Sequence, residues 1–230
     1  MNTYSPKDVV KIGKATLYLG DCYLMLEEIA KQADGLVMDP PYLFNASGGG
    51  KFRKARPLLN QAIDENLTKG FDHNTFGGGK FESCVVFCHN DQLPDLLPWV
   101  RQEWSRFALL EWHKKAPAPM ANKHYVSDTE FYIHSWNKGH HPLGTIKDLA
   151  RYHIEGSARS LRKITGHPTV KPHELMMKIV TNMNASVILD PFMGTGSTGV
   201  ACRNQGKAFI GIEENPKHFA TAIRRLRGEL

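Results

Sequence analysis

Short apolar runs recur along this chain, and between several of them the apolar residues repeat at helical spacing. Runs of this length, bounded by turn residues, are typical of buried strands. They predict strands at 16–19, 36–38, 84–88, 107–112, 131–136, 187–189 and 208–212. The helical spacing predicts helices at 23–30, at 172–183 and after Asn215-Pro216. Because strands and helices alternate, the pattern predicts an α/β fold with a doubly wound, mostly parallel sheet.

Two polar segments interrupt this alternation. Residues 43–80 contain two triple-glycine runs and a basic cluster. A connection of this length inside a domain is usually functional or disordered, so we expect a mobile basic loop. Residues 137–166 carry six basic residues and are expected to form a small basic insertion. The chain is long enough for one buried core and short for two, so residues 1–230 are expected to form a single domain.

Charge and cysteine content narrow the class of protein. The formal net charge of +6 at pH 7 favours a polyanionic partner. All four cysteines lie in or beside apolar runs, and the first residues lack a secretory pattern, so we expect a cytoplasmic protein. No apolar stretch approaches the roughly 20 residues of a membrane-spanning helix, so no membrane partner is expected. Cys84 and Cys88 flank a strand-like run, and we therefore expect no metal site.

A glycine-rich turn follows the strand predicted at 187–189. Gly194, Gly196 and Gly199 form a Gly-x-Gly-x-x-Gly pattern, and Glu213 lies 213 − 194 = 19 residues after the first glycine. Such a turn lets the backbone approach a ligand while the carboxylate binds ribose hydroxyls. Alone it is typical of a dinucleotide site, so an NAD-dependent oxidoreductase stays open. Asp190 at the start of the turn favours an amine-bearing or cationic ligand.

The sequence Asp39-Pro40-Pro41-Tyr42 follows the strand predicted at 36–38. An exocyclic amine on a nucleobase is a poor nucleophile because its lone pair is delocalised into the ring. Hydrogen bonds to the Asp39 carboxylate and the Pro40 carbonyl would localise that lone pair. The two prolines stiffen the turn. Tyr42 could stack on a base that has left its duplex.

Together, these motifs resemble the S-adenosylmethionine-dependent amino-methyltransferases of DNA, in the β order, where the catalytic motif precedes the cofactor motif. Gly20-Asp21-Cys22, the segment from His167 to Pro172 and the segment from Phe209 to Glu213 resemble further elements of that family. The resemblance implies a Rossmann-like fold with permuted motif order and the cofactor S-adenosylmethionine. It implies cofactor-binding roles for Asp21, Lys171, Asp190, Phe192, Gly194, Thr195, Gly196 and Glu213, and catalytic roles for Asp39, Pro40, Pro41 and Tyr42.

The same resemblance points to residues that contact the substrate. Trp112 and Lys114 lie in a segment that resembles the wall around the flipped base, although Trp112 fits a core position equally well. Residues 137–166 lie where β-order members carry their target-recognition region. Basic side chains there are expected to neutralise DNA phosphates, namely Arg151, Arg159, Arg162 and Lys163. Leu43 replaces the asparagine that often follows the family's tyrosine.

The sequence therefore predicts a DNA methyltransferase that transfers a methyl group directly to the N6 amine of adenine. Adenine is preferred because Asp39 is aspartate, whereas serine is commoner in that position among cytosine-N4 enzymes. Methylation of cytosine N4, of RNA or of a protein amide remains open, as does a non-catalytic DNA-binding protein. A homodimer is also expected, since the recognition region is small and family members often pair.

Overall fold

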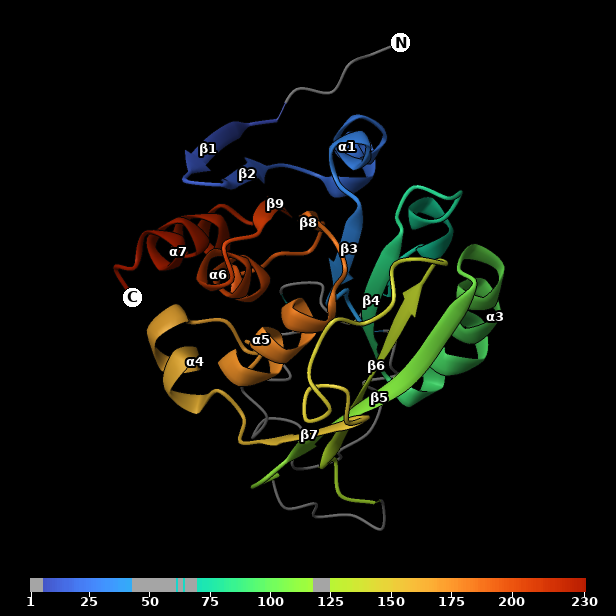
Figure 1. Cartoon of the computed structure of the whole chain (residues 1–230). Coiled ribbons are helices and arrows are strands. Elements are labelled where there is room, and N and C mark those ends of the chain that lie inside the picture. Colours follow the sequence, from blue (N-terminus) through green and yellow to red (C-terminus); the bar gives the residue numbers. More distant parts are fainter. Residues whose placement is uncertain (1–5, 43–60, 62–63, 65–69, 118–124) are drawn as a thin grey trace.

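The structure, a computed structural model, describes residues 6–42, 61, 64, 70–117 and 125–230. Its described part contains one nine-stranded sheet flanked by helices (Figure 1). The strands are β1 (Asp8–Ile12), β2 (Ala15–Leu19), β3 (Gly35–Met38), β4 (Ser83–Cys88), β5 (Arg106–Lys114), β6 (Thr129–Trp136), β7 (Tyr152–Glu155), β8 (Val187–Asp190) and β9 (Ala208–Glu213). The helices are α1 (Cys22–Ile29), α3 (Leu93–Glu103), α4 (Arg159–Thr165), α5 (His173–Asn182), α6 (Ser197–Asn204) and α7 (Pro216–Arg227). Three short 3₁₀ turns are η1 (Ala30–Gln32), η3 (His73–Phe76) and η4 (Asn90–Gln92).

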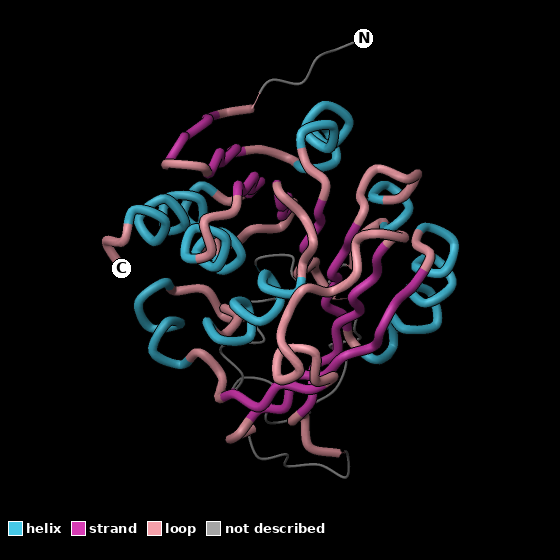
Figure 2. Tube along the Cα trace, viewed as in Figure 1, coloured by secondary structure: helices cyan, strands magenta, loops and turns pink. Residues whose placement is uncertain are grey.

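The sheet is mixed, with the order β1-β2-β9-β8-β3-β4-β6-β5-β7. Strands β2, β9, β8, β3 and β4 run parallel to their neighbours in this series, whereas β6 is antiparallel to both β4 and β5. Strand β3 pairs directly with β8, although about 150 residues separate them in the sequence (Figure 2). In open α/β sheets, ligands bind beyond the carboxyl ends of such strands. This pairing brings the turn after Met38 beside the turn that begins at Asp190.

Helices cover both faces of the sheet, which confirms the predicted doubly wound arrangement. Side chains on one face pack with α5, α6 and α7, among them Val37 and Val85. Their neighbours Leu36 and Val86 point to the other face and pack with α1 and α3. Because consecutive residues of β3 and β4 are buried on opposite faces, these strands appear in the sequence as uninterrupted apolar runs.

The elements that the pattern missed lie mostly at the margins. β1 alternates exposed and half-buried residues at one sheet edge, and β7 is a four-residue strand at the other. Helix α3 contains Pro94 and Pro98, which obscure its helical pattern. Residues 137–166, expected to form a small basic insertion, contain β7, which pairs with β5 at the sheet edge, and α4, which follows it. The insertion itself stays a prediction.

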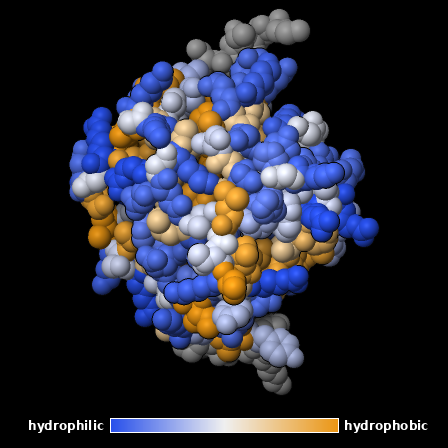
Figure 3. Space-filling view, viewed as in Figure 1, coloured by the Kyte–Doolittle hydropathy of each residue, from blue (hydrophilic) through white to orange (hydrophobic). Residues whose placement is uncertain are grey.

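Most of the predicted loop at 43–80 lies outside the described residues. Of the rest, residues 70–80 contain η3, and Phe76 is buried against the core. On the face drawn in Figure 3, hydrophilic surface predominates, with apolar patches between. Within the described ranges, every helix is too short or too polar to cross a bilayer.

Candidate active site

A cavity of about 950 Å³ opens beyond the carboxyl ends of β3 and β8. It is large enough for a drug-sized or nucleotide-sized ligand with space beside it. Its walls include most of the predicted site residues, namely Asp21, Asp39, Pro40, Pro41, Tyr42, Trp112, Lys114, Arg162, Lys171, Asp190, Phe192, Gly194, Thr195 and Glu213. The predicted residues Gly196, Arg151, Arg159 and Lys163 do not line it. The structure therefore joins the two sequence motifs in one site.

Asp190 fixes the first half of the glycine turn. Its carboxylate accepts hydrogen bonds from the Phe192 N–H, at 3.1 Å, and from the Thr198 hydroxyl, at 2.6 Å. The side chain is buried, and burial is the main cause that raises the pKa of this carboxyl to about 7. No lysine or arginine among the described residues forms an ion pair with Asp190. The carboxylate thus lies in the cavity wall without a cationic partner from the described chain.

Glu213, at the end of β9, fixes the second half of the turn. Its carboxylate accepts hydrogen bonds from the N–H groups of Gly194, at 2.9 Å, and Asn215, at 2.8 Å. Burial raises the pKa of Glu213 to about 7. Because two backbone N–H groups hold the carboxylate in place, the backbone also fixes the directions of its remaining lone pairs.

Gly196 is required at its position for two reasons. Its φ of +80° lies in the left-handed region that favours glycine. A Cβ atom here would also lie 2.9 Å from Cδ1 of Leu226 and 3.2 Å from Cβ of Ala222, on helix α7. The glycine therefore allows both the conformation of the turn and its close packing on α7.

An aromatic cluster forms the wall beside the glycine turn. Phe192 lies 6.3 Å from the Tyr23 ring, 6.0 Å from Phe71 and 5.6 Å from Phe76, measured between ring centroids. Asp21 caps helix α1 nearby by accepting a hydrogen bond from the Tyr23 N–H at 2.9 Å. This side of the cavity combines the aromatic side chains of Tyr23 and Phe192 with a carboxylate.

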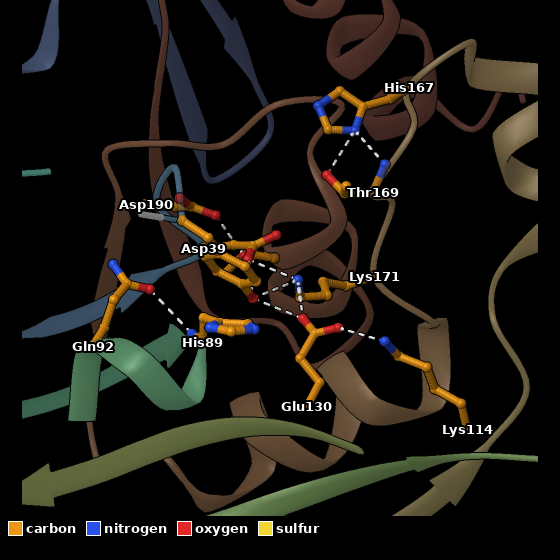
Figure 4. Close-up of polar contacts among 11 residues, drawn as sticks. Asp39, His89, Gln92, Lys114, Glu130, His167, Thr169, Lys171 and Asp190 are labelled. Atoms are coloured by element: carbon orange, nitrogen blue, oxygen red, sulfur yellow. Dashed lines mark hydrogen bonds and ion pairs between the residues drawn. The ribbon is translucent and has the colours of Figure 1, made fainter. Parts of the chain in front are cut away.

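The Asp39–Tyr42 motif lies at the other side of the cavity, in an ionic network (Figure 4). The ammonium of Lys171 donates to Oδ1 of Asp39 at 2.7 Å and contacts Oε1 of Glu130 at 2.6 Å. Burial raises the pKa of Asp39, while the positive charge of Lys171 opposes that rise. Lys171 was expected among the cofactor residues, and in the structure its ammonium contacts Asp39.

Tyr42 belongs to the same network. Its hydroxyl lies 3.0 Å from Oδ1 of Asp39 and 2.7 Å from Oε1 of Glu130, and Lys171 donates to it at 3.2 Å. The Tyr42 ring lines the cavity. Stacking of this ring on a base stays a prediction.

Glu130, on β6, is the site residue that the sequence analysis missed. It forms a salt bridge with Lys114 at 3.2 Å, in addition to its contacts with Lys171 and Tyr42. Lys171 and Lys114 lower the pKa of Glu130 to about 2 against the opposing effect of burial. Its local signal was weak, because Glu130 is an acidic residue just before the apolar run at 131–136, and 130 − 42 = 88 residues separate it from Tyr42. Only the sheet order brings the two together.

The other predicted substrate residues are more dispersed. Trp112 is buried, and its indole N–H donates to the Glu155 carbonyl at 2.9 Å, so it serves the core as well as the cavity wall. Arg162 of α4 lines the cavity, whereas the Arg159 guanidinium donates to the Ala116 carbonyl at 3.1 Å. Arg151 and Lys163 are exposed. In the described part of the chain, no three metal-ligating side chains gather as a metal site would require.

Comparison with known proteins identifies the family to which the chain belongs. The family model described as DNA methylase matches residues 101–224, more than half of the chain. The chain is 26% identical to the Type II methyltransferase M.HinfI of Haemophilus influenzae over 92% of its own length and 68% of that protein. It is 29% identical to the Type II methyltransferase M2.DpnII of Streptococcus pneumoniae over 52% of its length and half of that protein. The match thus spans only part of these relatives.

Solved structures give the same result for the fold. The crystal structure of the M1.HpyAVI–SAM complex superposes with a TM-score of 0.63 at 26% identity. The superposition covers 92% of this chain and 99% of that one. The mixed sheet with helices on both faces is therefore the fold of class I-like methyltransferases.

Proposed function

This chain belongs to the DNA methylase family, and we propose that it transfers the methyl group of S-adenosylmethionine to the N6 amine of adenine in DNA. The family includes enzymes that methylate adenine N6 and enzymes that methylate cytosine N4. We infer the activity of the whole protein from its site, because the chain spans only part of the length of these relatives. Methylation of cytosine N4 is the alternative, because the same acceptor chemistry serves both amines.

The single observation that carries the proposal is the state of the Asp39 carboxylate. Its Oδ1 is held by Lys171, while its Oδ2 accepts no hydrogen bond from any residue in the described ranges. The side chain is 25% exposed and lines the cavity. A carboxylate with one oxygen anchored and the other open is suited to accept an N–H from an exocyclic amine.

The other side of the cavity fits S-adenosylmethionine. This cofactor carries an amino group, a sulfonium and ribose hydroxyls, and when bound it supplies an activated methyl group. Asp190 is buried and Glu213 is half-buried, and the described partners of both carboxylates are hydroxyl and backbone N–H groups, so a cationic or hydroxyl-bearing ligand would compensate them. Phe192 and its aromatic neighbours offer a surface for a flat adenine ring.

Asp39 and Pro40 would act on the substrate amine by accepting its two N–H groups. That arrangement localises the nitrogen lone pair and aims it at the methyl group, so the protein contributes alignment and electrostatics. No covalent protein intermediate is required. The four cysteines agree with this, because all are buried and burial raises the pKa of each thiol.

The test is digestion of methylated DNA to nucleosides, followed by mass spectrometry, after incubation with labelled S-adenosylmethionine. We expect label in N6-methyladenine with the wild-type protein and none with Asp39→Ala. Label in N4-methylcytosine would keep the mechanism and overturn the assignment of the base. Absence of label in DNA, with cofactor binding intact, would contradict the proposed function.

A further inference from the structure

We propose that Glu130 is a positioning residue. By accepting hydrogen bonds from the Lys171 ammonium and the Tyr42 hydroxyl, it keeps Asp39 open to the substrate amine. This inference rests on the proposed function and deepens it. Its basis is the geometry around a single carboxylate on β6 that contacts both partners of Asp39 at distances shorter than or equal to those of Asp39 itself.

The first step concerns the proton of Tyr42. The hydroxyl lies near two carboxylates, but it has only one hydrogen to donate. Oε1 of Glu130 is nearer, at 2.7 Å, than Oδ1 of Asp39, at 3.0 Å. A proton directed at Glu130 leaves the Asp39 carboxylate with one fewer donor. The Tyr42 oxygen also accepts a hydrogen bond from Lys171 at 3.2 Å, so the hydroxyl is both a donor and an acceptor in the network.

The second step concerns Lys171. Its ammonium has three hydrogens, and three acceptors surround it: Asp39, Glu130 and Tyr42. The side chain is 6% exposed, so water cannot replace a missing acceptor easily. With Glu130 present, the ammonium keeps a second anionic partner when a substrate amine competes for Asp39. Without Glu130, Asp39 would be its only anionic partner within the network.

The third step concerns the charge of the whole network. Asp39 and Glu130 carry two negative charges, and Lys171 and Lys114 carry two positive ones. Lys114 lies 3.2 Å from Oε2 of Glu130, on the side away from Lys171, and holds the carboxylate in its orientation. Removal of Glu130 would leave an excess of positive charge that only Asp39 could compensate. Lys171 and Tyr42, which now contact only Oδ1 of Asp39, would then compete with the substrate amine for its Oδ2.

The experiment compares Glu130→Gln with the wild type under single-turnover conditions at saturating S-adenosylmethionine. The substitution keeps the shape of the side chain and removes its charge. We expect the transfer rate to fall by about 10- to 100-fold, as for a lost charged hydrogen-bond network at a reacting centre. The dissociation constant for S-adenosylmethionine should stay unchanged. Glu28→Gln, a matched change at an exposed residue of α1, should leave both quantities unchanged.

A pH profile separates positioning from a merely structural role. The charged groups around Asp39 are Lys171 and Glu130, with Lys114 beyond Glu130, and Asp190 lies across the turn. The negative charge of Glu130 raises the pKa of Asp39. In Glu130→Gln, the acid limb of the rate profile should therefore move to lower pH. A slower enzyme with an unmoved acid limb would overturn the inference.

A double variant gives a second, independent test, because it restores the charge balance that Glu130→Gln alone disturbs. Glu130→Gln combined with Lys171→Gln removes one charge of each sign, and with it the ammonium that would close Asp39. We expect the double variant to transfer methyl groups no more slowly than Glu130→Gln alone. A further large loss would contradict the assigned role of Glu130. Unchanged transfer by Glu130→Gln would overturn the inference while the proposed function stands, whereas an inactive wild type would overturn both.

Discussion

The two sides of the cavity hold their carboxylates in opposite ways. At the end of β3, Asp39 lies in a network whose carboxylates are balanced by lysines. At the ends of β8 and β9, Asp190 and Glu213 accept hydrogen bonds from backbone N–H groups and a hydroxyl, with no ion pair to a described residue. The first side is therefore complete as an electrostatic unit, whereas we infer that a ligand completes the second.

The pKa shifts express the same contrast. The lysines lower the pKa of Glu130 to about 2, so that it stays ionised despite its burial. At the other side, burial raises the pKa of Asp190 and of Glu213 to about 7. A ligand that prefers ionised carboxylates would therefore bind the second side more tightly as the pH rises. The first side should govern the rate of transfer, and the second the affinity for the cofactor.

Removal of the central cation should have the largest effect on stability. Lys171→Gln leaves two carboxylates in a buried network, and the loss of one partner of a buried pair costs about 3–5 kcal/mol. Chemical denaturation at pH 7 measures the free energy of unfolding. Lys31→Gln, which breaks an exposed pair on α1 and the following turn, is the control and should leave it nearly unchanged.

The pH dependence sharpens this prediction. The pKa of Glu130 is lower in the folded state than its ordinary value, so its contribution is present above pH 4.5 and is lost as the pH falls towards 2. The deficit of Lys171→Gln relative to the wild type should therefore shrink over that range. A deficit that is constant between pH 7 and pH 3 would contradict the role of charge.

A substitution in the glycine turn tests the second side of the cavity, where backbone geometry holds the carboxylates. Gly196→Ala should destabilise the protein by at least about 1–2 kcal/mol, the cost of a left-handed conformation for an L-residue. The clash with Leu226 adds to that cost. Gly206→Ala is matched, because Gly206 also has a positive φ but has no atom within 4 Å of the added Cβ. Equal losses of thermal stability in the two variants would show that packing on α7 contributes nothing.

The affinity for S-adenosylmethionine should depend on pH through the carboxylates of the second side. One carboxylate with a pKa of about 7 that must be ionised predicts about tenfold tighter binding at pH 8 than at pH 6. Isothermal titration at several pH values measures this dependence. Glu213→Gln should bind more weakly and show a smaller dependence, whereas an equally steep dependence would exclude Glu213 as its source.

Substitution of the basic residues beside the cavity should have the smallest effect per residue, and that effect should be on DNA binding. Arg159→Gln combined with Arg162→Gln should weaken DNA binding and lower the slope of log K against log salt by up to about 2, near 0.9 per phosphate contact. Arg224→Gln combined with Arg227→Gln removes two charges from exposed positions of α7. If both pairs change the slope equally, the effect comes from net charge and not from residues of α4.

The sequence predicted the second side better than the first, and the reason is physical. Asp190, Gly194 and Gly196 lie within one turn, so their geometry follows from local backbone preferences. Glu130 enters the site only because β6 runs antiparallel beside β4, and no local pattern encodes that pairing. The same reason explains Lys171, whose ammonium lies on a residue 171 − 39 = 132 positions away.

The fold shows a similar division. Strands buried on both faces, such as β3 and β4, were predicted because their apolar runs are continuous. The edge strands β1 and β7 were missed, since their mixed exposure leaves no such run. The predicted homodimer and the predicted target-recognition region at 137–166 stay predictions.

The most direct test measures cofactor affinity and methyl transfer on the same preparation of Asp39→Ala. If the two sides of the cavity act separately, this variant binds S-adenosylmethionine with the wild-type dissociation constant. Its single-turnover rate on DNA falls by about 10²- to 10³-fold, the usual cost of a lost electrostatic contact at a reacting centre. Methyl transfer at the wild-type rate, or a loss of cofactor binding as large as the loss of rate, would contradict the account.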